Sequence, residues 1–529
     1  MEPSGRLELT WANKHLRLIS NPEGGYEWVD PTDPRVSEVR LLHDVDTVGD
    51  DTTDGNLLIE GDALHALTAL NRIPELARRY AGQVRLVYID PPFNTGQAFA
   101  HYDDNLEHSV WLSMLRDRLV QLKPLLAPNG SIWVHLDDAE VHRCRVVMDE
   151  VLGAANFIGT AIWHRTKAPK NSAIHLSLDH DFLLAYAADG RLWRSNLLPR
   201  TEAMDAKFTN RDDDPRGPWF PDNLSARNFY SKGTYSITCP SGRVIAGPPK
   251  GRFWRFSEER FKTLDADGRI WWGADGDKSP TYKLFLAEVR SGRVASTVWP
   301  PEEVGYVRNG KQEIKALFPD IDPFSTPKPE RLIQRVLQVA SDPGDIVLDC
   351  FAGSGTTAAV AHKMGRRWVT SEREPGTVST FTRPRLEKVV KGEDPGGITD
   401  AVDWKGGGGF RQARVGPSMF DLDAETGDVY LAEWATNGAF SEAVAAQLGF
   451  ERVVEPPFCG RKGRTRLAVL DGVVGEAEVE FLVSALDERE RVVVVGQAFT
   501  EEAEPTLRRL SPGSKVRHAP HDLLRGGRR

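Results

Sequence analysis

The chain has 529 residues, a formal net charge of −9, and charged and apolar fractions of 27% and 40%, which are typical of a folded protein with several units. No apolar run approaches the roughly 20 residues that span a bilayer, and the first residues lack the apolar core of a signal peptide, so we expect a cytoplasmic protein. The cysteines show no paired spacing and predict neither a disulfide framework nor a zinc site; they are Cys144, Cys239, Cys350 and Cys459.

Charge is unevenly distributed along the chain. Between Val151 and Gly310 we count roughly 23 Lys and Arg against about 18 Asp and Glu, whereas the last third is acidic. The net negative charge argues against binding to phosphates. A basic segment on an acidic chain is nevertheless compatible with local contacts to DNA.

We expect residues 1–54 to form a loosely structured arm with a helix and a hairpin. The first predicted strand that ends near a possible binding residue follows this arm. Residues 56–60 are an apolar strand that ends in an acid, and Asp62 can act as the N-cap of a helix over residues 63–70.

Residues 86–96 read LVYIDPPFNTG and dominate the chemistry of the chain. The apolar run predicts a buried parallel strand, and two prolines force the chain out of the sheet after Asp90. Open α/β sheets bind ligands at the carboxyl ends of their strands. Asp90 and the Pro91 carbonyl can accept the two hydrogens of an exocyclic amine, and Phe93 can stack on a planar base. A strand-end turn with a buried aromatic is the plainer interpretation.

Further elements follow the same βα pattern. Residues 111–119 have apolar positions at helical spacing, residues 130–138 predict another buried strand, and residues 139–152 predict a helix. His135 and Asp137 lie near that strand's end and are expected to be mostly solvated.

Residues 157–310 differ in character from the flanking sequence. Helical periodicity weakens, Gly and Pro increase, and aromatic residues alternate with basic ones, as in Trp163–Lys167, Arg227–Lys232 and Lys250–Arg255. Such a mixture suits contacts to the DNA backbone and to base edges. For any single residue, an irregular insertion with a solvated basic face is the plainer interpretation.

The second decisive stretch is a strand at residues 345–349 that runs into a glycine-rich turn with Gly353 and Gly355. A helix over residues 357–364 follows, and residues 367–372 form a strand that ends at Glu372. Glycines allow close approach of the backbone to a ligand, and an acid about 20 residues on is typical of binding to ribose hydroxyls. Alone, this pattern also fits a dinucleotide-binding fingerprint.

Residues 392–529 are first Gly-rich and then acidic. Residues 466–470 and 491–495 predict buried strands, with helices between and after them. We expect a small, separate α/β domain.

Asp90-Pro91-Pro92-Phe93 resembles the catalytic (D/N/S)PP(Y/F/W) tetrapeptide of the DNA amino-methyltransferases, which methylate adenine N6 or cytosine N4. The form Asp-x-Phe-x-Gly-x-Gly, residues 349–355, is similar to their S-adenosylmethionine loop, and residues 324–329 to their (F/Y)xTxKP element. The tetrapeptide precedes the loop, with the basic insertion between them, as in the β group of the family. The resemblance covers residues 57–391.

The resemblance implies an α/β fold: a doubly wound Rossmann-like methyltransferase sheet with an inserted target-recognition domain and a small C-terminal α/β domain. The catalytic residues that it implies are Asp90, Pro91, Pro92 and Phe93. The residues that it implies for S-adenosylmethionine, with no metal, are Asp62, Thr326, Lys328, Asp349, Phe351, Gly353, Gly355 and Glu372. The boundaries that we expect are 1–54 for an N-terminal arm, 55–156 for the catalytic half, 157–312 for the target-recognition insertion, 313–391 for the cofactor-binding half and 392–529 for an assembly domain.

The implied reaction is methylation of adenine N6 in double-stranded DNA. The target base leaves the helix, Phe93 stacks on it, and the amine nitrogen attacks the sulfonium methyl directly. The layout is similar to the modification subunits of type III restriction–modification systems, which implies a homodimer and a helicase–nuclease partner. Three alternatives stay open: cytosine N4 as the target, because Phe93 replaces the commoner Tyr; a nucleotide-cofactor oxidoreductase; and a non-catalytic DNA-binding specificity subunit.

Overall fold

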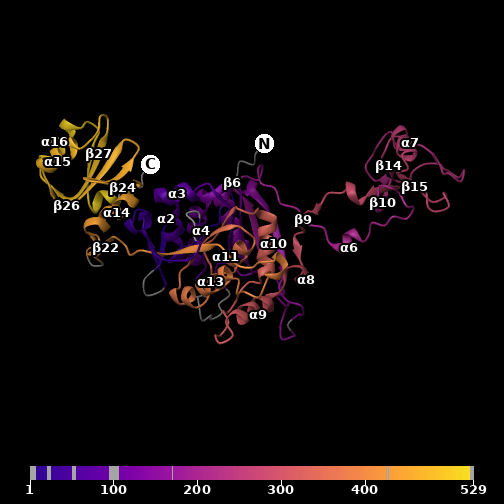
Figure 1. Cartoon of the computed structure of the whole chain (residues 1–529), viewed down its shortest axis with the longest axis horizontal. Coiled ribbons are helices and arrows are strands. Elements are labelled where there is room, and N and C mark those ends of the chain that lie inside the picture. The colour runs from indigo at the N-terminus through magenta and orange to yellow at the C-terminus, as the bar shows by residue number, and fades with distance from the viewer. Residues whose placement is uncertain are drawn as a thin grey trace. The chain divides into compact units, whose positions relative to one another are not determined.

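The computed structural model describes residues 7–20, 25–50, 55–94, 107–169, 171–423, 426 and 428–524, so Thr95 and Gly96 of the central motif lie outside the described residues. A ten-stranded sheet organises the larger of two compact units, residues 1–196 and 296–529 (Figure 1). Its strands, in spatial order, are β18 (Val298–Trp299), β7 (Phe157–His164), β8 (His180–Ala187), β6 (Leu126–Leu136), β5 (Val84–Ile89), β19 (Ile346–Asp349), β20 (Arg367–Glu372), β4 (Asn56–Glu60), β21 (Gly409–Val415) and β3 (Leu42–Gly49).

The centre of this sheet is parallel and changes direction of winding once. β6, β5, β19, β20, β4 and β21 run parallel to one another, and β8 and β3 run antiparallel to their neighbours. From β5 the chain continues to β6 on one side, and from β19 it continues to β20 on the other. The switch between β5 and β19 is where an open α/β sheet forms its binding crevice.

Two groups of helices pack against the sheet, and Figure 1 separates them by colour, indigo to purple for the first and orange for the second. The first group encloses a core with Val87 and Ile89; it consists of α2 (Ala63–Arg72), α3 (Pro74–Tyr80), α4 (His108–Leu122) and α5 (Val141–Met148). In the second group, α10 (Glu330–Ala340) packs on β5 and α11 (Thr356–Lys363) packs on β19 and β20. The third helix of this group, α13 (Arg383–Lys391), packs on α11 and on β3. The predicted doubly wound α/β fold is confirmed.

Three stretches assigned elsewhere from the sequence belong to this sheet. β3 comes from the expected arm, where β1 (Arg17–Ser20) and β2 (Tyr26–Val29) form the expected hairpin. β7 and β8 come from residues assigned to the insertion, as do α8 (Pro301–Val304) and α9 (Val307–Leu317) of the same unit. β21 comes from residues assigned to the C-terminal domain. Pairing of β3 with β21 joins segments more than 350 residues apart, which no local pattern reveals.

The second compact unit comprises residues 197–295, narrower than the predicted insertion at 157–312. Most of its strands are two to five residues long; the largest sheet has β10 (Trp219–Asn223), β16 (Thr281–Phe285) and β15 (Ile270–Trp271). Aromatic residues from strands and from α7 (Glu258–Ala266) fill its small core, among them Trp254, Phe261 and Trp272.

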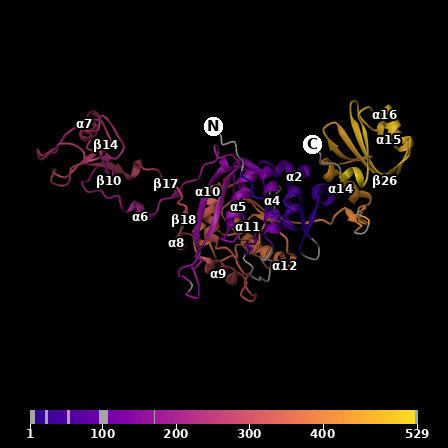
Figure 2. The same cartoon turned by 180° about the vertical axis from the view of Figure 1, so that it is seen from behind.

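The C-terminal part of the first unit carries a second sheet, drawn in yellow in Figures 1 and 2. Its strands are β24 (Glu451–Glu455), β25 (Phe458–Lys462), β26 (Thr465–Val474), β27 (Arg491–Phe499) and β28 (Lys515–His518). Leu467 and Val495 pack with α14 (Asn437–Leu448) and α17 (His521–Leu524). The alternate residues Ala468 and Val494 pack with α15 (Glu476–Ser484) and α16 (Ala503–Leu510). The expected strands and helices of this region are therefore present. None of the helices among the described residues is long and apolar enough to cross a membrane.

Candidate functional site

Acidic residues follow three neighbouring parallel strands at the same edge of the large sheet. Asp90 follows β5, Asp349 is the last residue of β19, and Glu372 is the last residue of β20. β5 and β19 flank the point where the winding reverses. The two halves of the predicted site, far apart in sequence, therefore meet at one crevice.

Asp90 is held by a single cation. Lys328 Nζ lies 2.5 Å from Asp90 Oδ2 and 4.8 Å from the centre of the Phe93 ring. The other oxygen, Asp90 Oδ1, is buried and has no hydrogen-bond partner among the described residues. A buried carboxylate oxygen without a partner is costly, so Oδ1 can accept a hydrogen bond from a bound donor.

Phe93 rests on a buried polar chain that starts inside β6. The His135 ring lies 5.6 Å from that of Phe93, and Tyr88 Oη lies 2.8 Å from His135 Nδ1. His135 Nε2 lies 3.4 Å from Asp181 Oδ2, and Arg165 lies 3.1 Å from Oδ1 of the same carboxylate. Burial alone would raise the pKa of Asp181, but its contacts with His135 and Arg165 lower it. The sequence predicted that His135 is a solvated strand-end residue. That prediction is wrong, because the side chain is fully buried.

Side chains from other elements hold the turn after Asp90 in place. Trp111 Nε1 donates to the Pro92 carbonyl at 2.7 Å. Asn94 has a φ of 61°, in the left-handed region, and its amide donates to buried Glu140 at 2.8 Å. The Pro92 carbonyl is thus occupied by an indole N–H, and the role of the Pro91 carbonyl as an acceptor stays a prediction.

The glycine loop adopts a conformation that side chains resist. Gly353 and Gly355 have φ angles of 51° and 77°, and a Cβ on Gly355 would lie 3.2 Å from the Thr382 side chain. Gly353 N donates to Glu372 Oε2 at 2.8 Å, and Thr382 Oγ1 donates to the Gly353 carbonyl at 2.7 Å. Phe324 lies against Gly353, since a Cβ there would lie 3.4 Å from its ring. The loop is thus a rigid backbone cradle.

The acids beside this loop bind protons tightly. Burial raises the pKa of Asp349 to about 7, and the charges of Asp90 and Glu372 act in the same direction. Phe351 N donates to Asp349 Oδ1 at 2.9 Å. Burial also raises the pKa of Glu372. The influence of Asp90 on Asp349 reflects the closeness of the two halves.

Asp62 differs in charge state from these neighbours. It is the N-cap of α2, accepting from Leu64 N at 2.7 Å, and it also contacts Arg118 at 2.8 Å and Ser20 at 3.1 Å. Burial alone would raise its pKa, but Arg118 and the other nearby positive groups lower it to about 2. Its predicted contact with a cofactor stays a prediction, as does that of half-buried Thr326.

Comparison with known proteins identifies the family. A family model described as "DNA methylase" matches residues 84–383, which is more than half of the chain. The chain belongs to the DNA methylase family. The resemblance stated from the motifs is thereby confirmed.

Relatives of this DNA methylase family member include subunits of restriction–modification enzymes. The chain is 31% identical over 343 residues to the type III restriction-modification enzyme StyLTI Mod subunit of Salmonella typhimurium, covering 59% of this chain and 50% of the relative. It is 28% identical over 421 residues to the probable type III restriction-modification enzyme HindVI Mod subunit of Haemophilus influenzae. This match covers 70% of this chain and 55% of the relative. The chain thus spans about half the length of these curated relatives. Among solved structures, the cytosine-N4-specific PvuII DNA methyltransferase is 16% identical with a TM-score of 0.35, covering 63% of this chain and 86% of that one.

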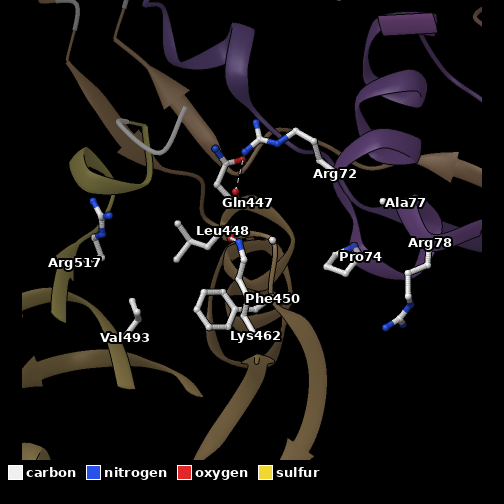
Figure 3. A pocket seen from close by; sticks show the side chains of 11 residues that line it. Arg72, Pro74, Ala77, Arg78, Gln447, Leu448, Phe450, Lys462, Val493 and Arg517 are labelled. Atoms are coloured by element: carbon white, nitrogen blue, oxygen red, sulfur yellow. Dashed lines mark hydrogen bonds between the residues drawn. The ribbon is translucent and has the colours of Figure 1, made fainter. Parts of the chain in front are cut away.

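A second cavity lies away from these residues. This cavity has a volume of about 690 Å³. Its lining side chains, shown in Figure 3, come from α2, α3, α14, β25, β27 and β28 and from the turn after α14. Arg72 donates there to the Gln447 carbonyl at 3.1 Å, and none of the predicted site residues lines it. We assign the candidate site to the crevice between β5 and β19.

Proposed function

We propose that this protein transfers a methyl group from S-adenosylmethionine to N6 of adenine in DNA, as the modification component of a restriction–modification system. The observation that carries the proposal is the arrangement at Asp90. One oxygen of this carboxylate is buried and has no hydrogen-bond partner among the described residues. The other oxygen bonds to Lys328, which also lies over the Phe93 ring, and the glycine loop follows the neighbouring strand. Membership of the DNA methylase family and similarity to type III Mod subunits support it.

The residues of the second half fit the methyl donor. Gly353 and Gly355 have positive φ angles that side chains rarely adopt, and without a Cβ they let a ligand approach the backbone closely. Glu372 accepts two backbone N–H groups, one on each oxygen, and each oxygen keeps a lone pair for a ribose hydroxyl. When bound, S-adenosylmethionine supplies an electrophilic methyl group. The chain's own contribution is alignment of a nucleophile with that group.

The first half fits an exocyclic amine. Phe93 stacks on the flipped base, Asp90 accepts one amine hydrogen, and the Pro91 carbonyl accepts the other. This arrangement holds the amine while its nitrogen lone pair points away from both acceptors. Lys328 now covers the Phe93 ring and bonds to Asp90, so its ammonium group leaves the face of the ring when the base enters and keeps its bond to Asp90. Lys328 therefore belongs with the base pocket in our proposal, although its motif predicted a contact with the cofactor.

We further propose roles for the outer parts of the chain. Residues 197–295 with their short strands read the target sequence, and the yellow C-terminal sheet of Figure 1 mediates assembly with a second copy or a helicase–nuclease subunit. Adenine is our proposed target because the motif order resembles that of adenine-modifying type III subunits; cytosine N4 is the alternative within the same chemistry.

The test is a product analysis. Purified protein is incubated with S-adenosylmethionine and mixed-sequence DNA, and the DNA is digested to nucleosides for mass analysis. N6-methyladenine is the expected product. N4-methylcytosine would show that the target is cytosine N4. Cofactor binding without a methylated nucleoside would favour a non-catalytic specificity subunit. Tighter calorimetric binding of NAD than of S-adenosylmethionine would favour an oxidoreductase.

A further inference from the structure

The connection between β7 and β8 emerges at the catalytic edge of the sheet. Leu136, the last residue of β6, pairs with Phe182 of β8. His164 at the end of β7 pairs with His180 at the start of β8. Since β6 runs parallel to β5, the described residues of this connection, 165–169 and 171–179, leave the sheet at the same edge where Asp90 follows β5.

The base of this connection is tied to the aromatic residue of the site. Arg165 and Asp181, which flank the connection, form an ion pair at 3.1 Å. Asp181 lies 3.4 Å from His135, whose ring packs against Phe93. Arg165 N also donates to the Asp179 carbonyl at 2.9 Å. The segment is therefore anchored beside the proposed base pocket.

The far part of the connection exposes large apolar side chains. Ile174 is 91% exposed and Leu176 is 83% exposed. Among the large apolar residues that the structure describes as exposed, Ile174 ranks first, and only Val454 at 87% lies between the two. Two large apolar side chains with this exposure, separated by one residue, favour contact with another molecule.

The chemistry of the surroundings favours DNA as that molecule. Arg165 and Lys167 stand at the base of the segment, and Lys167 Nζ lies 5.0 Å from the centre of the Tyr306 ring. Asp179, the acidic residue of the segment, is bonded internally by Ser177 and Thr166. Exposed apolar side chains on the same connection as these cations, at the edge that carries Asp90, match the side chains that proteins insert between base pairs.

We propose that Ile174 and Leu176 form an apolar wedge, which enters the DNA helix beside the target base and fills the space that the flipped base vacates. The wedge lowers the cost of unstacking and unpairing that every enzyme acting on a flipped base faces. This inference rests on the proposed function, because it assigns the wedge to the same DNA substrate.

The first experiment measures binding and requires no catalysis. Fluorescence anisotropy compares wild type with the I174A/L176A double variant on a mixed-sequence duplex and on the same duplex with one abasic site. Wild type should prefer the abasic duplex several-fold, because its stack is already open, and the double variant should lose this preference. Val454→Ala, which shortens an equally exposed side chain on β24, should behave as wild type, and I174L/L176M should retain the preference.

The second experiment uses methyl transfer on a site mapped by sequencing wild-type-treated DNA. The double variant should lose tenfold or more in kcat/KM on a fully paired duplex and approach wild type when the target base faces an abasic site. Equal losses of kcat/KM on the paired and the abasic substrate, or no loss on either, would overturn the proposal that these side chains form a wedge. No loss on either is also the outcome expected if these side chains bind a protein partner. A wild type that prefers abasic DNA but methylates none would refute the proposed function and leave the wedge standing.

Discussion

Two strand ends of one sheet carry the same pattern, an apolar strand and then an acid, but the surroundings give the acids different properties. Asp90, after β5, has a lysine on one oxygen, and its other oxygen has no hydrogen-bond partner among the described residues. Asp349, at the end of β19, is fully enclosed, and burial raises its pKa to about 7. The first arrangement suits binding of an amine, and the second supports the glycine cradle. The pattern places an acid, and its neighbours decide what the acid does.

Rigidity of the β19 side should be tested first, because the largest effect is expected there. Gly355→Val places a branched side chain at a φ of 77° and 3.2 Å from Thr382. We expect S-adenosylmethionine binding to weaken by roughly 100-fold or more, because the strain and the clash together exceed about 3 kcal/mol. Calorimetric titration measures this. Gly376→Ala, where a Cβ meets nothing within 4 Å, is the matched control. Unchanged binding of S-adenosylmethionine by Gly355→Val would contradict a role of this loop in cofactor binding.

On the β5 side, Lys328→Met removes the cation that orients Asp90. We expect kcat to fall roughly tenfold or more, since hydrogen bonds to charged groups contribute about 1.5–3 kcal/mol. Steady-state methyl transfer gives the value. Lys405→Met, at an exposed lysine paired with Asp403, should leave kcat unchanged. A Lys328→Met variant with wild-type kcat but weaker cofactor binding would mean that Lys328 contacts the cofactor, as its motif first predicted.

The charge states predict opposite pH behaviour at two positions. The raised pKa of Asp349, about 7 against an ordinary 3.8, means that its contribution to stability falls as pH rises from about 4 through 7. Asp349→Asn should therefore gain thermal stability relative to wild type between pH 5 and pH 8. The pKa of Asp62 is lowered to about 2, so its contribution is lost only as pH falls from about 4 toward 2.

Asp62→Asn serves as the matched comparison, because it should reduce the melting temperature equally at pH 5 and pH 8. Melting curves of wild type and both variants at these two pH values decide the point. Parallel pH dependences for Asp349→Asn and wild type would contradict the raised pKa of Asp349.

The smallest effect is expected beneath Phe93. Tyr88→Phe deletes the hydroxyl that contacts His135 at 2.8 Å, and we expect a loss of about 1 kcal/mol in the free energy of unfolding with little change in kcat. Chemical denaturation measures it. Tyr430→Phe, at a half-exposed tyrosine, should have no effect. A large loss of kcat in Tyr88→Phe would mean that His135 acts more directly than as support for Phe93.

Sequence alone predicts the elements whose signals are local. The strand before Asp90, the glycine turn at Gly353 and the helix after Asp62 are all where the pattern places them, because burial, prolines and caps act over a few residues. Lys328 and Asp90 are 238 residues apart, and their contact arises only when the sheet forms. The same holds for His135 and Asp181, whose types and spacing do not distinguish a buried pair from solvated strand ends.

The measurement that tests the account most directly combines cofactor binding and methyl transfer in Asp90→Ala. The account predicts wild-type affinity for S-adenosylmethionine in calorimetric titration, because the cradle is untouched, and no methylated nucleoside in the digested DNA. A variant that still methylates DNA would contradict the central claim that the acid after β5 holds the reacting amine.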